Sequence, residues 1–165
     1  MSEQKTKPRI EDVILKMRDG SNKNNALQFV TYLNEQQLTP VKCPWIDGKW
    51  KIPFGKYYLG WISISASTWS FENFNFLQFG EHIDDDKAFI EAICKHVKIC
   101  NKPCHDECYG ALDVMVFGRQ FNSVCSNHGK AFSNPSKKTI EHLKKLISYG
   151  KKIVPRDHIY HCHYL

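Results

Sequence analysis

The residues whose side chains are most suited to metal binding or reaction are cysteines, five of which fall in the segment from Cys94 to Cys125. Cys100, Cys104 and Cys108 follow a C-x3-C-x3-C spacing, and Cys125 lies after the next predicted strand. Zinc prefers four thiolate or imidazole ligands in a tetrahedron, commonly from a tight loop and a distant element. The sequence therefore predicts that Cys100, Cys104, Cys108 and Cys125 bind one zinc ion. Since four sulfur ligands leave no open coordination position, we expect a structural site.

Other interpretations of the same cysteines stay open. The chain has seven cysteines, an odd number, and its first residues lack the apolar block of a secretion signal. We therefore expect a cytoplasmic protein, in which stable disulfides are rare. The alternatives to zinc are iron–sulfur ligation, thiols packed as small apolar side chains, and a thiol or redox function of the loop.

The region around the cysteines resembles a known family. Clustered cysteines from Cys100 to Cys108 are followed by Phe117-Gly118-Arg119-Gln120-Phe121 with Val124-Cys125, and then by Phe132-Ser133-Asn134-Pro135 before a lysine-rich helix. Over about residues 45 to 150 the chain is similar to a family of small bacterial proteins with clustered cysteines, a "GKEF…VC"-like segment and an "F-x-NP" helix start. The resemblance implies an aromatic-rich sheet before the cysteines, and it implies no activity, because none is assigned to the family.

Aromatic residues of the predicted sheet form a second candidate site. Such residues most often build a hydrophobic core, but they can also line an apolar pocket for a small ligand. The side chains that would line this pocket are Trp50, Tyr58, Trp61, Trp69 and Phe71. We do not expect nucleic acid as a partner, because the lysines Lys49, Lys51 and Lys56 of this region are too few to follow a phosphate backbone.

The positive charge of the chain lies near its C-terminal end. The formal net charge is +6; residues 130–165 hold eight basic and two acidic residues, whereas residues 1–129 hold fifteen of each. A basic helix can bind an anionic partner, and the residues that would do so are Lys137, Lys138, Lys144 and Lys145. The alternative is a solvated face opposite a buried apolar stripe.

Hydrophobic periodicity indicates the elements that must position these residues. Apolar residues recur at helical spacing over 10–17, 22–33, 87–99 and 135–150, and the last helix is expected to have Asn134 as its cap and Pro135 as its first residue. Residues 50–54, 57–65, 69–79 and 111–117 have strand character, with a tight turn at Gly55-Lys56. We therefore predict an α+β fold in which N-terminal and C-terminal helices cover an antiparallel β-meander sheet.

The length of 165 residues suits one domain, which we assign to the whole chain with residues 1–8 and 156–165 as flexible ends. Leu, Ile, Val and Phe number 42, about a quarter of the residues, which excludes a disordered chain. No apolar run is long enough to span a membrane. Motifs of nucleotide-binding loops, nucleophile elbows and zinc proteases are absent, so the sequence provides no basis for naming an enzyme activity.

Overall fold

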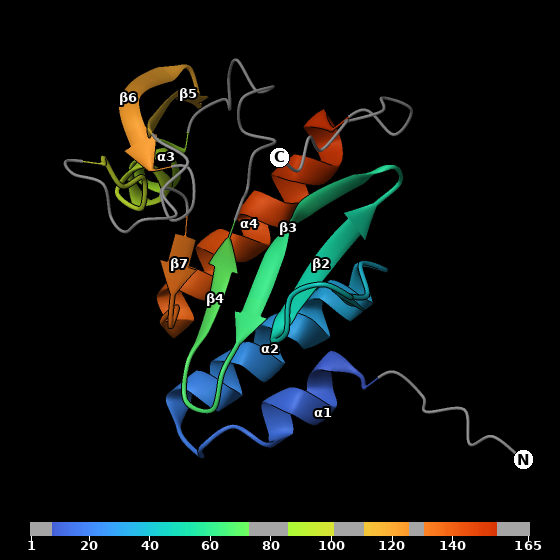
Figure 1. The fold of residues 1–165 in the computed structure, drawn as a ribbon. Helices are drawn as coiled ribbons and strands as arrows, with labels where there is room; N and C mark the ends of the chain where they lie inside the picture. The colour runs from blue at the N-terminus through green and yellow to red at the C-terminus, as the bar shows by residue number, and fades with distance from the viewer. Residues whose placement is uncertain (1–7, 73–85, 101–110, 126–130, 155–165) are drawn as a thin grey trace, which may run out of the picture.

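A computed structural model describes residues 8–72, 86–100, 111–125 and 131–154, and these residues form an α+β fold (Figure 1). The helices are α1 (Ile10–Leu15), α2 (Ser21–Glu35), α3 (Lys87–Cys94) and α4 (Lys137–Ile153). The strands are β1 (Val41–Lys42), β2 (Lys49–Phe54), β3 (Tyr57–Ile64), β4 (Trp69–Glu72), β5 (Ala111–Val116), β6 (Arg119–Cys125) and β7 (Ala131–Ser133).

The main sheet has five antiparallel strands in the order β1-β2-β3-β4-β7. Its first four strands follow one another as a meander, and β7 adds to the free edge of β4. This arrangement confirms the predicted fold class. The strand β7 was not predicted, because three residues are too few to show a periodic pattern. Its central residue, Phe132, lies directly opposite Phe71.

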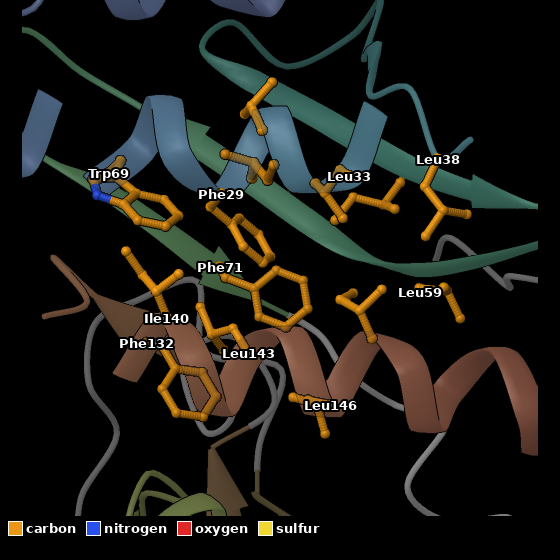
Figure 2. Packing of buried hydrophobic residues seen from close by; sticks show 14 of the residues in the cluster. Phe29, Leu33, Leu38, Leu59, Trp69, Phe71, Phe132, Ile140, Leu143 and Leu146 are labelled. Atoms are coloured by element: carbon orange, nitrogen blue, oxygen red, sulfur yellow. The ribbon is translucent and has the colours of Figure 1, made fainter. Parts of the chain in front are cut away.

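The helices α2 and α4 pack against the same face of the main sheet (Figure 2). They also contact one another: the hydroxyl of Tyr32 on α2 donates to the carbonyl of Lys144 on α4 at 3.0 Å. The side-chain amide of Asn25 donates to the carbonyl of Pro135 at 2.9 Å. N-terminal and C-terminal segments therefore form one layer over the sheet.

Large apolar side chains fill the space between the two layers. The ring of Phe29 on α2 lies 5.7 Å from the rings of both Trp69 and Phe71 on β4, centroid to centroid. Phe71 in turn lies 6.5 Å from Phe132. The stripe that α4 contributes is fully buried and consists of Ile140, Leu143, Leu146 and Ile147. Burial of these residues is the main force that holds the layers together.

A β-bulge in β3 decides which side chains of that strand face the core. Lys51 pairs with Trp61, but Pro53 pairs with Tyr58, so β3 has one extra residue between these two pairs. Gly60 lies in the bulge with a φ of +152°, a conformation that favours glycine. The bulge therefore allows Leu59 within it and Ile62 after it to be buried in the same core, although they are three residues apart.

The strands β5 and β6 form a separate hairpin that lies beside α3 (Figure 1). Val116 and Val124 of this hairpin belong to the buried cluster, and Phe117 contacts Phe89 of α3 at 5.8 Å between ring centroids. Most other side chains of the two strands are exposed. A two-stranded hairpin is only marginally stable in water, so this one depends on its contacts with other parts of the molecule.

Two helix boundaries differ from the sequence prediction. The residue that caps α4 is Ser136, whose hydroxyl accepts from the backbone amide of Thr139. Asn134 instead has a φ of +45° and accepts from the backbone amide of Trp69, which ties the segment before α4 to the sheet. The helix α3 ends at Cys94, and Ile99 pairs with Val124 of the hairpin.

Candidate functional site

The structure places two of the predicted zinc ligands on adjacent extended segments. The backbone amide of Cys100 donates to the carbonyl of Ser123 at 2.6 Å, and that of Cys125 donates to the carbonyl of Lys98 at 3.2 Å. Cys100 and Cys125 are thus diagonal neighbours on either side of the Ile99–Val124 pair. Diagonal neighbours in a regular ladder lie about 7–8 Å apart. Two thiolates can bridge this spacing at one zinc ion, because each Zn–S bond is about 2.3 Å long.

The other two predicted ligands, Cys104 and Cys108, lie outside the described residues. Within the described ranges, no group of three or more His, Cys, Asp or Glu side chains is arranged to hold a metal ion. The structure therefore describes one half of the predicted ligand set, Cys100 and Cys125, and positions that half by backbone hydrogen bonds.

Two further cysteines are buried structural residues. Cys94 closes α3, and burial raises the pKa of its thiol, although the positive charge of Arg119 acts in the opposite direction. Cys43 is 3% exposed, and its backbone amide donates to the carbonyl of Lys49 at the edge of the main sheet. A thiol that stays protonated is a poor nucleophile, so the structure provides no support for a catalytic role of Cys94.

The five aromatic residues predicted to line a pocket are divided between the two faces of the main sheet. Trp50, Trp69 and Phe71 point toward the helices and are at most 2% exposed. Tyr58 and Trp61 lie on the second face, with their ring centroids 6.1 Å apart. The alternation of side chains along each strand causes this division, and the five residues therefore do not line a common pocket.

The aromatic rings of the second face surround a lysine of the protein itself. The ammonium of Lys51 lies 4.6 Å from the ring centroid of Tyr58, 5.4 Å from that of Trp61 and 5.7 Å from that of Trp45. Lys51 pairs directly with Trp61 across β2 and β3, which fixes this arrangement. Cation–π attraction stabilises such a contact, so these rings already have a cationic partner.

A hollow of about 310 Å³, lined mainly by residues of polar type, lies at one end of the second face. The residues that line it include Lys49, Ser63, Ser70, Ser133 and Asn134. The sequence did not predict this hollow, since its lining includes polar residues of strands whose prominent pattern is aromatic. The alternation of Lys49 and Lys51 with Trp50 and Ile52 did indicate that one face of this strand is polar.

Asp47 is the carboxylate that lines this hollow. Glu72 pairs with Lys49 of the lining and lies in a compact polar network. Its carboxylate accepts from the ammonium of Lys49 at 3.1 Å and from the hydroxyl of Ser70. Burial alone would raise the pKa of Glu72, but these hydrogen bonds and the charge of Lys49 outweigh that effect and lower the pKa below 4.5. Glu72 is therefore ionised and paired at neutral pH, and it is unsuited to act as a general acid.

The four lysines of the predicted anionic-partner patch do not form one surface. Lys144 pairs with Glu141 and Lys145 pairs with Asp86, each at 2.8 Å. Lys144 also lies over the ring of Tyr32 on the α2 side, whereas Lys145 lies over Phe89 on the α3 side. Lys137 and Lys138 are exposed in the first turn of α4. The four lysines are therefore not one patch, because the helical periodicity directs Lys144 and Lys145 to different sides of α4 and both of them pair with carboxylates.

No helix in the described part of the chain is long and apolar enough to cross a lipid bilayer. A scan against protein-family models, a search of curated proteins and a search of solved structures gave no match to this chain. The resemblance to the small bacterial proteins with clustered cysteines therefore stays a prediction.

Proposed function

We propose that Cys100, Cys104, Cys108 and Cys125 bind one structural zinc ion that holds the β5–β6 hairpin in place. The observation that carries this proposal is the pair of backbone hydrogen bonds that place Cys100 beside β6 and Cys125 beside the segment after α3. In this proposal Cys104 and Cys108, which lie outside the described residues, supply the remaining two thiolates. A tetrahedral set of four thiolates is the usual composition of a closed zinc site.

The weak burial of the hairpin supports a structural role for the ion. In β5 only Val116 is buried, and in β6 only Val124 and Cys125 are. Conformational entropy opposes the ordering of such a segment, and little apolar burial offsets it. Metal binding can supply the missing free energy, because a site that forms only in the folded state couples binding to folding.

Metal content is the first test of the proposal. The full chain is purified without a histidine tag, and its zinc is measured by mass spectrometry. We expect about one equivalent of zinc for a closed site. Less than about 0.2 equivalents, together with rapid reaction of all cysteines with a thiol reagent in the native protein, would contradict zinc binding and favour a thiol or redox role.

Cysteine variants locate the site. We expect Cys125→Ser and Cys104→Ser to lose the zinc, whereas Cys43→Ala, a change at a buried thiol directly after β1, keeps it. Hydrogen exchange separates a local from a global effect. Removal of the ion by a chelator should accelerate exchange over residues 111–125 and leave β2 and β3 protected. Full zinc content in both serine variants would rule out this ligand set.

A further inference from the structure

A second hollow of about 390 Å³ lies between α3 and α4, away from the main sheet's second face. It exists because the side chains of Ala88 and Ala92, one helical turn apart on α3, are too small to fill the space toward α4. Its volume falls in the range of small-molecule sites, about 300–1,000 Å³. Neither the cysteines nor the aromatic residues discussed above line it.

Basic groups from both helices line this hollow. Lys95 and His96 follow the end of α3, and Lys138 and His142 lie one turn apart on α4. The hydroxyl of Thr139 is also part of the lining. Two ammonium groups, two imidazoles and a hydroxyl together provide several hydrogen-bond donors around one space. The two ammonium groups are charged donors, which bind anions more strongly than neutral donors do.

The local charge favours an anion even though one carboxylate is present. Glu91 lines the same hollow and offsets one of the two lysines. The first turn of α4 holds no acidic residue, and its two lysines, Lys137 and Lys138, lie at the positive end of the helix dipole. Cations at this end of a helix are unfavourable for the fold by themselves, and an anion bound nearby relieves the repulsion.

Two of the side chains that line the hollow also contact neighbouring aromatic rings. The ring of His96 stacks on Phe132 of β7 with centroids 4.1 Å apart, and the ring of His142 lies 6.2 Å from that of Phe89. The ion pair between Lys145 and Asp86 joins α4 to the start of α3. The imidazoles of His96 and His142 are held in this way, so they lose little conformational entropy when a ligand binds.

We propose that the hollow between α3 and α4 binds the phosphate group of a small phosphate monoester. A phosphate monoester has several acceptor oxygens and a charge between about −1 and −2 at neutral pH, which suits donors that approach from two helices. Lys95 and Lys138 supply the charge, while His96, His142 and Thr139 supply directed hydrogen bonds. This site is independent of the proposed zinc ion, and it replaces the predicted patch, of which only Lys138 remains.

The test is a titration of the full-length, isotope-labelled protein followed by NMR at constant ionic strength. The probes are inorganic phosphate and glycerol 3-phosphate, with glycerol as the uncharged control. We expect saturable shifts of the amides of residues 88–96 and 138–142 with both phosphates and none with glycerol. Binding of inorganic phosphate without glycerol 3-phosphate would overturn the monoester class. The absence of saturable shifts at about 20 mM of either would overturn the site.

Charge-removing variants test the location. We expect Lys138→Gln and Lys95→Gln each to weaken binding of glycerol 3-phosphate by about three- to tenfold, the loss of one charged hydrogen bond. Lys137→Gln is the matched control, since it removes the same charge from the same helical turn but does not line the hollow. It should change the affinity by less than about twofold. Equal weakening by Lys137→Gln and Lys138→Gln would show diffuse attraction and contradict the site.

Discussion

The ring of Phe71 lies against the α-carbon of Gly60. A β-carbon at position 60 would be 2.5 Å from Cε2 of Phe71 and 2.9 Å from the carbonyl oxygen of Glu72. Both distances are too short for a carbon atom, so the bulge in β3 and the position of Phe71 depend on one another. The close approach of β3 and β4 at this point requires a glycine.

Gly60→Ala is therefore expected to destabilise the fold by about 2–4 kcal/mol, from steric overlap and backbone strain together. The matched control is Gly20→Ala, because Gly20 has a similar φ of +144° but no atom within 4 Å of the added β-carbon. Gly20→Ala introduces the backbone strain without the steric overlap, so it should lower the free energy of unfolding by less than Gly60→Ala does. Urea unfolding monitored by tryptophan fluorescence measures both; equal losses would show that contact with Phe71 is unimportant.

Phe29 links α2 to two aromatic residues of β4. Its side chain is completely buried and contacts Trp69 and Phe71. We expect Phe29→Ala to lower the free energy of unfolding by about 3–5 kcal/mol, because it leaves a cavity between helix and sheet. Phe29→Leu, which keeps most of the volume, should cost less than half as much. A loss below about 1 kcal/mol for the alanine variant would mean that the layers are not packed as described.

Glu72 gives the protein an acid-sensitive component of stability. Its pKa in the folded protein lies below the value of 4.5 expected in the unfolded chain, so the unfolded state binds more protons between these two values. Its contribution to stability is thus complete above about pH 4.5 and is lost as the pH falls through the folded pKa. Lys49 and Ser70 are the partners that produce this effect.

Glu72→Gln should remove that component. At pH 7 we expect the variant to be less stable by about 2 kcal/mol, because Lys49 loses a charged hydrogen bond. The two proteins should converge in strong acid, where Glu72 is protonated. Other carboxylates contribute to both curves equally, so the difference between them is the quantity to measure by chemical denaturation. A difference that does not change with pH would contradict the ionised pair.

Asp86 has two separable functions at the start of α3. Its carboxylate accepts from the backbone amide of Phe89 at 2.9 Å and from the ammonium of Lys145 at 2.8 Å. Asp86→Asn should keep the helix cap and lose the ion pair, whereas Asp86→Ala loses both. We therefore expect the alanine variant to have the lower melting temperature. An asparagine variant as unstable as the alanine variant would assign the effect to the ion pair.

The sequence was sufficient for the elements whose periodicity extends over several turns or strand residues. The apolar stripe of α4 and the alternation of Trp50, Ile52 and Phe54 with Lys49 and Lys51 predicted a helix and a half-buried strand, and both are present. Elements that depend on contacts distant in sequence were missed. The strand β7 is three residues long and exists because its residues pair with β4, about sixty positions earlier.

For the candidate sites too, some features could be predicted from the sequence and others depend on the tertiary structure. The sequence alone indicated the residue types: the cysteines, which are predicted metal ligands, and the lysines of α4, which carry the positive charge. Which of them meet was decided by the tertiary structure: backbone pairing brings the segments of Cys100 and Cys125 together, and α3 packing on α4 brings Lys95 near Lys138. Local patterns record burial along one element, whereas a binding site depends on the relative placement of several elements, which long-range packing determines.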